Sequence, residues 1–232
     1  MCLCKRKHKI YLWFFLIGIF SLTGQREDRK RLAISSFEKL KISSNIEVSL
    51  IQSDANVLLV YGQNSDNITL SIKNRELKIN LIGGNILNTE KTKVDLYHRS
   101  IIEKIFVKKG ATLSSKYPIK QEGLMIEAKT NGNISLELFA EKLKTKISLG
   151  GKVCLKGKVD THKLEINTSS ICEAENLDTK KTVLISKAGA FAYIKTKTLL
   201  EAKIYGGVIR EFGNPEKRNV ENKLGGKIYI EK

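Results

Sequence analysis

The feature that most constrains this chain of 232 residues is a cluster of small or polar residues that recurs in its second half. The copies are separated by 19, 19, 19, 18 and 19 residues, and they centre on Asn131, Gly150, Ser169, Ala188, Gly206 and Gly225. Glycine and asparagine tolerate positive φ, and small side chains let neighbouring backbones approach, so each cluster predicts a tight corner. Recurrence at a nearly constant length is typical of stacked repeats.

Apolar residues flank each corner at strand spacing. The positions three residues after the corner are Ile134, Val153, Cys172, Phe191, Ile209 and Ile228, and those five after it are Leu136, Leu155, Ala174, Tyr193, Glu211 and Ile230. The positions three residues before it are Ala128, Ile147, Ile166 and Ile185, with Ile126, Leu164 and Val183 two residues further back. Mainly Lys, Glu, Thr and Ser lie between them, which predicts strands with one buried and one wet face.

A unit of about 19 residues cannot bury its own apolar face, so the units must stack and share a core. Stacked strands lie about 4.8 Å apart, which turns each repeat position into a column. We therefore predict an all-β fold, a β-helix-like solenoid of about 19-residue repeats, in which Ile134, Val153, Cys172 and Phe191 form a single column. A β-sandwich of hairpins would also explain the strands, but it gives no reason for a constant repeat length.

The preceding part of the chain is rich in strands but lacks this register. We expect strands at Ile46–Leu50, Val57–Val60, Ile68–Ile72, Leu77–Leu81 and Val94–Tyr97, with turns at 74–76 and 83–85. The sequence thus divides into an irregular N-terminal β-rich part, residues 37–107, and a C-terminal repeat part, residues 108–232.

The N-terminal residues have the pattern of a secretory signal peptide. Four basic residues precede an apolar run over residues 10–20, which ends in Ser21-Leu22-Thr23-Gly24. A membrane anchor is the alternative, but the run is shorter than the roughly 20 residues that span a bilayer. We predict a signal peptide at 1–24, a mobile segment at 25–36 and no stable membrane span in the mature chain. The protein would be exported to the periplasm, the outer-membrane surface or the extracellular space.

The chain is strongly basic, and its formal net charge is +17. Removal of residues 1–24 takes away four basic side chains and leaves +13. An exported protein meets no genome and the chain has no zinc or RNA-binding signature, so we expect no nucleic-acid partner. Anionic glycans, lipopolysaccharide or an envelope protein fit the charge better. The alternative is that the lysines are simply the solvated outer positions of strands.

Two cysteines, Cys154 and Cys172, lie in the predicted mature chain. The alternation places Cys172 inward and Cys154 outward on neighbouring coils. Their Cβ atoms should therefore diverge, and we expect no disulfide between them.

Several phrases resemble the family of exported bacterial adhesins that carry the head GIN domain. The resemblance begins with FEKLKISSNIEVSLIQSDANVLLVYG from Phe37, includes VDLY at 94–97, and ends with IYGGVIREFGNP at 204–215 and LGGKIYIEK. The family's Gly-Ser-Gly corners are replaced here by residues 168–170 and 187–189. The resemblance covers nearly the whole predicted mature chain and implies an elongated β-helical protein of the cell envelope with an adhesive role.

Catalytic chemistry needs side chains that converge in a pocket, and the sequence shows no such group. We expect His98 and His162 to be solvated, and the scattered Asp residues favour neither a calcium cage nor an acid–base pair. Glu173 and Glu175 can share one face, where we expect solvated ion pairs. We therefore predict no enzyme, catalytic residue, metal or cofactor. A polysaccharide lyase or hydrolase on a β-helix and an envelope structural or regulatory protein remain alternatives.

The predicted function is that of a non-catalytic surface-binding protein, an adhesin, of unknown ligand and oligomeric state. Tyr205 and Phe212 are the candidate ligand-binding residues because exposed aromatic rings stack on sugars. Covering the last coils of the stack is their alternative role.

Overall fold

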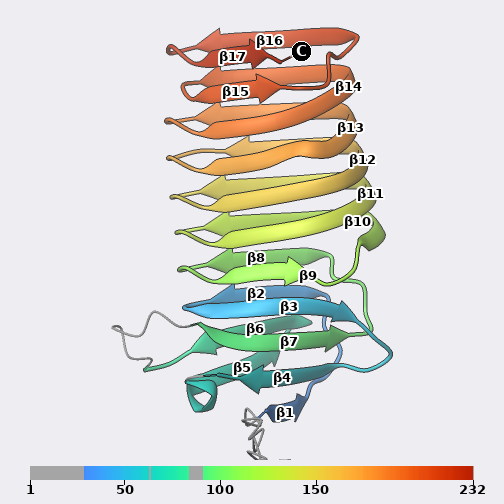
Figure 1. Ribbon diagram of the computed structural model, residues 1–232, viewed down its shortest axis with the longest axis vertical. Coiled ribbons are helices and arrows are strands. Elements are labelled where there is room, and N and C mark those ends of the chain that lie inside the picture. Colours follow the sequence, from blue (N-terminus) through green and yellow to red (C-terminus); the bar gives the residue numbers. More distant parts are fainter. Residues whose placement is uncertain (1–28, 63, 84–90, 232) are drawn as a thin grey trace, which may run out of the picture.

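The computed structural model describes residues 29–62, 64–83 and 91–231. These residues form an elongated stack of β-strands with about seven turns, which confirms the predicted solenoid (Figure 1). Within these ranges there is no α-helix, and the one helical turn is the 3-10 turn η1, Ser65–Asn67. In the same ranges no helix is long and apolar enough to cross a bilayer. The predicted signal peptide, 1–24, lies outside the described residues.

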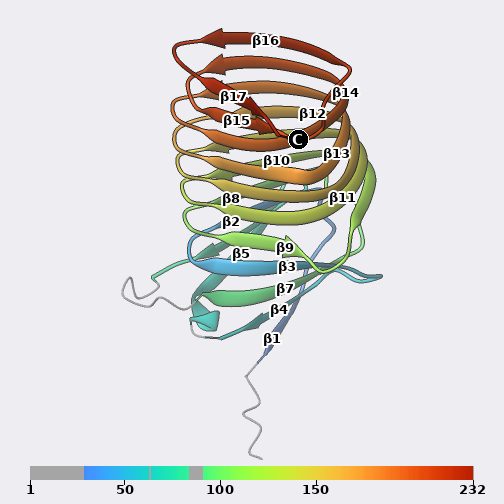
Figure 2. The same cartoon turned by 45° about the horizontal axis from the view of Figure 1, so that its top comes forward.

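Each coil of the repeat part is one long strand that bends through an arc. The strands are β10 (Ile119–Lys129), β11 (Asn133–Ser148), β12 (Lys152–Ile166), β13 (Ile171–Lys187) and β14 (Phe191–Tyr205). Neighbours pair in parallel. A strand such as β11 runs along one wall, rounds the arc, returns along the other wall and ends at a tight corner (Figure 2). The stack closes with β15 (Val208–Glu211), β16 (Lys217–Lys223) and β17 (Lys227–Ile230).

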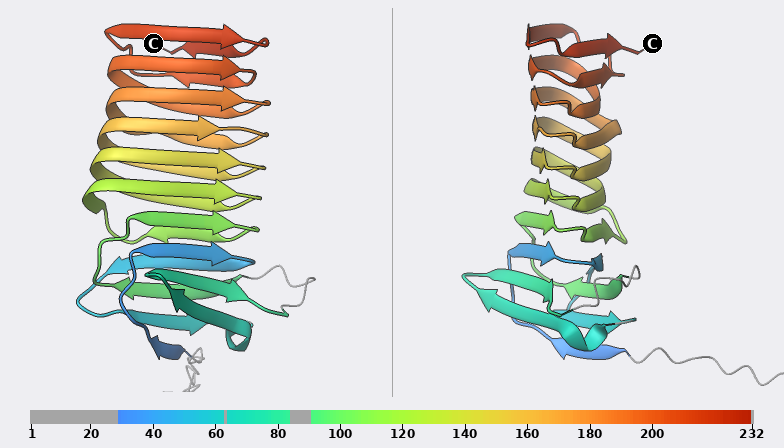
Figure 3. Two further views of the ribbon diagram at one scale, coloured as in Figure 1. Left: turned by 180° about the vertical axis from the view of Figure 1, so that it is seen from behind. Right: turned by 90° about the vertical axis from the view of Figure 1, so that its left-hand side faces the viewer.

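The flattened coils thus enclose the core between two walls. The front wall of Figure 1 contains β15, β17 and the first halves of β11–β14. The back wall contains β16 and the second halves of β10–β14, and it faces the viewer in the left view of Figure 3.

The N-terminal part continues both walls, but not in chain order. It consists of β1 (Lys30–Ala33), β2 (Lys39–Ser43), β3 (Ile46–Gln52), β4 (Val57–Tyr61), β5 (Ile68–Lys73), β6 (Glu76–Leu81), β7 (Thr92–His98), β8 (Lys104–Lys108) and β9 (Thr112–Ser115). The coil β2–β3 lies between the coils β6–β7 and β8–β9. Spatial neighbours are therefore not sequence neighbours, which is why a constant repeat length is missing here.

Antiparallel strands cover the N-terminal end of the stack. β5 pairs with β6, β4 pairs with β7, and β1 pairs with β4. Lys30–Ala33, within the segment 25–36 that we expected to be mobile, is thus part of the sheet, where its pairing with β4 supplies backbone hydrogen bonds; residues 25–28 lie outside the described ranges.

The corners have the predicted backbone. Pairs of successive residues with positive φ occur at Thr130-Asn131, Leu149-Gly150, Thr168-Ser169, Ala188-Gly189, Gly206-Gly207 and Leu224-Gly225. Two successive left-handed residues suit the right-handed twist of the strands they join. The following residue is small at five of these six corners, with Val208 as the exception. The coils touch there: a Cβ on Gly151 would lie 2.6 Å from the carbonyl oxygen of Ala128.

The predicted column of apolar residues is correct for three coils and wrong at the fourth. Ile134, Val153 and Cys172 are in register and buried, but Cys172 pairs with Ala192, and Phe191 is exposed. The cause is a β-bulge. Cys154 pairs with Glu173, whereas Lys156 pairs with Asn176, so β13 contains one extra residue. A slip of one residue moves each later side chain to the other face.

The same bulge reverses the prediction for the second half of β13. Ile166 pairs with Ser186, and the buried residues of this half are Thr182, Leu184 and Ser186. Val183 and Ile185, which we expected in the core, are only partly buried and point outward.

The interior also contains a histidine that we expected to be solvated. His162 is buried in a column with Leu143, Thr182 and Leu200, and its Nε2 lies 2.9 Å from the hydroxyl of Thr145. Burial lowers the pKa of His162 to about 4. His98 is half-buried at the end of β7, where its Nδ1 lies 2.9 Å from the carbonyl oxygen of Ser100.

The cysteines lie as predicted. Cys172 is buried and Cys154 is partly exposed, and both thiols are free. Burial raises the pKa of both thiols.

Candidate functional site

The outer face of the back wall changes character at β13. Elsewhere on β11–β14 its outward positions are mainly charged or polar, but β13 presents two β-branched apolar side chains, Val183 and Ile185. They face outward because the bulge in β13 shifts the alternation by one residue. The result is an apolar strip on a wall whose other outward side chains are mainly charged or polar.

This strip forms the floor of an open groove of about 460 Å³ that crosses β13, β14 and β16. Side chains along it include Val183, Ile185, Glu201, Lys203, Asn219 and Glu221. A second hollow continues from Ile185 and Lys203 to Lys187, Ala188 and Tyr205 at the tight corner. We call the two together the C-terminal groove.

Tyr205 stands at the corner end of the C-terminal groove. It is the last residue of β14, and its ring lies between two ammonium groups: Lys187 Nζ is 5.7 Å and Lys223 Nζ is 5.9 Å from the ring centroid. Cations at this distance are attracted to the ring face and hold the ring in place. Tyr205 thus combines an apolar ring with a rim of positive charge.

Ion pairs border the groove on both sides. Lys181 lies 2.9 Å from Glu201, and Glu221 contacts both Lys203, at 3.6 Å, and Lys223, at 2.7 Å. The hydrogen bond with Lys223 lowers the pKa of Glu221 and raises that of Lys223. Both charges are therefore present at neutral pH, and the groove offers apolar floor together with donors and acceptors.

Phe212, the second predicted binding residue, is not brought close to Tyr205. It follows β15 at the arc end of the front wall, whereas Tyr205 ends a strand of the back wall at the tight corner. Phe212 is exposed, and its backbone N–H donates to the carbonyl oxygen of Ile194 at 2.9 Å.

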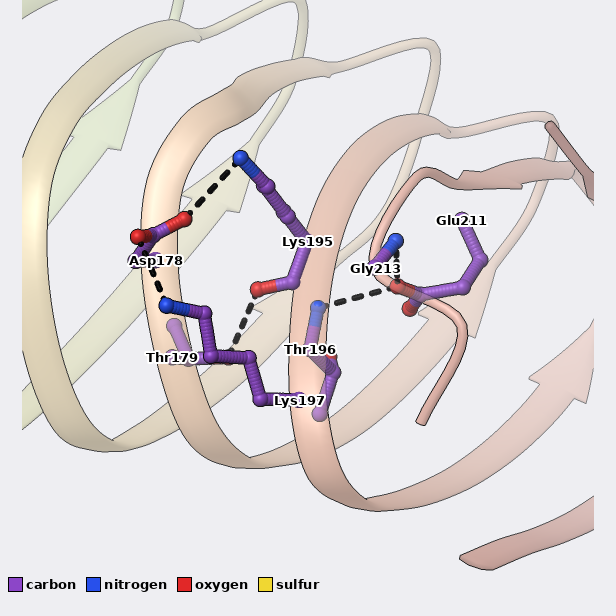
Figure 4. A network of polar contacts seen from close by, with 7 residues as sticks. All are labelled: Asp178, Thr179, Lys195, Thr196, Lys197, Glu211 and Gly213. Carbon is purple, nitrogen blue, oxygen red and sulfur yellow. Dashed lines mark hydrogen bonds and ion pairs between the residues drawn. The ribbon is translucent and has the colours of Figure 1, made fainter. Parts of the chain in front are cut away.

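The turn that carries Phe212 is held by a buried carboxylate, Glu211 (Figure 4). Glu211 Oε1 accepts hydrogen bonds from the backbone N–H groups of Thr196, at 2.9 Å, and Gly213, at 2.7 Å. Burial raises the pKa of Glu211, and the two N–H donors oppose that shift. Because Oε1 is occupied by two backbone donors, it has a structural role; Oε2 is buried and has no hydrogen-bond partner among the described residues.

A second set of contacts in Figure 4 lies outside the arc. Asp178 contacts Lys195 at 3.0 Å and Lys197 at 2.9 Å, and these bonds lower the pKa of Asp178. The two ion pairs join β13 to β14 and are typical of the exposed ladders on this protein.

The carboxylates weighed as a catalytic pair, Glu173 and Glu175, have different surroundings. Glu173 forms a 2.6 Å ion pair with Lys152, as expected for a solvated position. Glu175 lies at the bulge, where its Oε2 is buried and has no hydrogen-bond partner. Across residues 29–62, 64–83 and 91–231, no group of three or more His, Cys, Asp or Glu side chains could hold a metal ion.

Sequence reasoning singled out Tyr205 as a candidate but did not predict the groove beside it. Val183 and Ile185 were assigned to the core, so the wall next to Tyr205 was expected to be polar. The corner spacing held no signal for this, because the interval across β13, from Ser169 to Ala188, is 19 residues like those before it.

The solenoid closely resembles solved bacterial structures of low sequence identity. A Bacteroides fragilis protein described as a "putative adhesin" is 20% identical, with a TM-score of 0.81 over 89% of this chain and 97% of that one. A Parabacteroides merdae protein with the same description is 18% identical, with a TM-score of 0.68 over 89% and 96%. A Parabacteroides distasonis protein described as a "putative lipid binding protein" is 15% identical, with a TM-score of 0.67 over 90% and 98%. These likenesses show the fold.

No curated protein matches the sequence. The family profile described as "putative auto-transporter adhesin, head GIN domain" matches residues 36–215, which is more than half of the chain. The descriptions of this family and of the solved relatives name adhesins or lipid-binding proteins and no enzymes. With β-solenoid and sequence in agreement, the chain belongs to the head GIN domain family.

Proposed function

We propose that this protein is an exported, non-catalytic envelope protein that binds surface glycans through the C-terminal groove. The observation that carries the proposal is the outward apolar strip of Val183 and Ile185, which runs to the ring of Tyr205 on a wall otherwise covered by ion pairs. Sugars present apolar ring faces and polar edges, and this groove offers a partner for each.

Family membership supports an adhesive role, and the N-terminal sequence pattern supports export. The rigid stack supports binding rather than turnover, because parallel coils present a long fixed surface. A catalytic site would need a base or nucleophile facing the groove. Its carboxylates, Glu201 and Glu221, are instead engaged by lysines.

The test is binding of the purified protein to a glycan array and to whole cells at two salt concentrations. Saturable binding that persists at higher salt is expected, since apolar stacking is not screened. Tyr205→Ala should weaken this binding, whereas Tyr193→Ala, which removes an outward ring from the front wall of the same strand, should not. Equal loss in both variants, or release of unsaturated products from a polyuronide, would contradict the proposal.

Export has its own readout. Fractionation of cells that express the whole chain should place the protein in the envelope or medium, and N-terminal sequencing should find Gln25 as the first residue. A protein that retains Met1 and stays in the cytoplasm would rule out export.

A further inference from the structure

The lysines of the back wall fall into two groups with different surroundings. On the repeat coils they alternate with acids on neighbouring coils: Glu165 contacts Lys144 at 3.8 Å and Lys146 at 3.2 Å, and Lys203 contacts Glu221 at 3.6 Å. Such ladders are the solvated outer positions of a sheet. They need no ligand to explain them.

Nearer the N-terminal end the same wall gathers lysines beside one another. Lys41 on β2 lies in register with Lys78 on β6, and Lys108 on β8 lies in register with Lys129 on β10. Over the described ranges, Lys41, Lys108 and Lys129 form no ion pair, while Lys78 contacts Glu76 at 3.4 Å. Burial, together with the like charges of Lys41, Lys109 and Lys129, lowers the pKa of Lys108.

Acidic side chains on this part of the wall pair with only one lysine of the cluster, Lys78, among the described residues. Glu76 faces Lys78, and Glu127 lies on β10 beside Phe106, with no ion pair to any described lysine. The ring of Phe106 instead contacts two of the cluster: Lys41 Nζ is 5.2 Å and Lys108 Nζ is 5.7 Å from its centroid. The ring holds both ammonium groups near each other.

A groove of about 260 Å³ lies over these lysines, and we call it the basic groove. It crosses β5, β6, β2 and β8 on the outer face, and its lining includes Lys41, Lys78, Lys108, Ser43, Ser71 and Asn80. Asn80 Oδ1 accepts hydrogen bonds from the hydroxyls of Ser43, at 2.7 Å, and Ser44, at 2.9 Å. Because its oxygen is occupied, the group that Asn80 can still offer is its amide N–H₂, a donor.

The basic groove therefore presents three ammonium groups and an amide donor in one hollow. Gathering like charges is unfavourable unless an opposite charge joins them, and oxyanions accept hydrogen bonds from all of these donors. We propose that the basic groove binds a phosphate or sulfate group carried by an envelope polymer or lipid. The inference rests on the proposed function, because it assigns a charged portion of the ligand to the same wall that carries the C-terminal groove.

The experiment measures affinity of the purified full chain for probes that separate the sources of the anion. The probes are inorganic phosphate, dextran sulfate with neutral dextran of equal size, and phosphatidylcholine vesicles with and without phosphatidylglycerol, at about 150 mM salt. Preferential binding of dextran sulfate identifies a polymer, and preferential binding of the anionic vesicles identifies a lipid surface.

The decisive comparison is between two double variants of equal charge change. Lys41→Gln/Lys108→Gln neutralises the basic groove, and Lys142→Gln/Lys158→Gln neutralises two exposed lysines at the arc that have no ion pair in the described part of the chain. We expect the first variant to lose at least about tenfold in affinity and the second to lose little. Lys41→Arg/Lys108→Arg should retain binding.

The groove variant should fold, since it relieves repulsion between like charges, and its thermal midpoint serves as the check. Equal weakening in both Gln variants would reduce the binding to diffuse charge attraction and overturn the proposal. Absence of binding to all three anionic probes would also overturn it. If the anionic probes do not bind but a neutral glycan binds through Tyr205, the anion site is wrong and the proposed function still holds. Failure of the anion site can thus be distinguished from failure of the proposed function.

Discussion

Thr145 and His162 lie on neighbouring coils inside the solenoid and share a 2.9 Å hydrogen bond between the threonine hydroxyl and the imidazole Nε2. Both side chains are fully buried. Burial lowers the pKa of His162 to about 4, so the stack contains a buried imidazole that is neutral at pH 7.

This pair should make the protein sensitive to acid. His162 has a pKa of about 4 in the fold and 6.5 when unfolded, so its contribution to stability is present above pH 6.5 and is lost as pH falls toward 4. The shift corresponds to a loss of about 3 kcal/mol in the free energy of unfolding. Urea unfolding of the wild type and of Thr145→Val/His162→Leu between pH 7 and 4 measures it. The double variant, which leaves no unpaired partner, should have the shallower pH slope; equal slopes would contradict the assignment.

The contact between coils at the corners should make Gly151 intolerant of even one methyl group. A Cβ there would lie 2.6 Å from the carbonyl oxygen of Ala128, so Gly151→Ala should cost about 1–3 kcal/mol in unfolding free energy. Gly123→Ala is the matched control, since its Cβ would meet Lys142 O at an ordinary 3.8 Å. Chemical denaturation measures the free energy of unfolding of both variants. Similar values for the two would refute a close contact between coils at Gly151.

Leu149 should be a site where stability can be gained. It has φ 53° at a corner and is 47% exposed, so it carries backbone strain while burying little apolar surface. Leu149→Asn should raise the free energy of unfolding by about 0.5 kcal/mol, because asparagine tolerates this conformation. Leu224→Asn, at the same position of the last corner with φ 57°, should behave alike. Lower thermal midpoints in both variants would argue against strain at these residues.

Two substitutions of Glu211 should separate the contribution of its hydrogen bonds to stability from that of its charge. Glu211→Ala leaves the buried N–H of Thr196 and the N–H of Gly213 without their acceptor and should cost about 1–3 kcal/mol. Glu211→Gln keeps an acceptor oxygen. Because burial raises the pKa of Glu211 in the fold, its stabilising contribution is present below pH 4.5 and is lost as pH rises. The Gln variant should therefore gain stability relative to the wild type from pH 4 to pH 7; no relative change would show that the folded pKa is not raised.

The sequence was sufficient for the architecture because corners and alternation depend on local chemistry. Gly150 and Gly225 mark backbone that few other residues adopt, and the predicted strands of the N-terminal part, such as Val57–Val60 in β4, lie where the structure has them. The coil order of that part was not predictable, since pairing of β2 with both β6 and β8 depends on contacts far apart in the chain.

The C-terminal groove could be predicted only in part. Tyr205 was recognisable as an aromatic residue beside a corner. Its neighbours in the groove, however, depend on which residues of β13 face outward. One extra residue after Ala174 exchanges the inner and outer faces, so Val183 and Ile185 could not be placed without the pairing of β12 and β13. His162 illustrates the same limit, because a polar residue in an inward column looks in sequence like one on the solvent face.

The interleaved position of β2–β3 has a consequence for how the chain reaches its final form. A ribosome delivers this coil before either of its two neighbours, and its outer edges stay unpaired until residues 76–98 and 104–115 have followed. The coil β2–β3 is therefore made first but gains both of its neighbours late. By contrast, β11 to β14 can each pair with the preceding coil as they emerge. Assembly should start from the block that ends at β9 and spread toward the C terminus, so that removal of the last coils is tolerated far better than removal of the first.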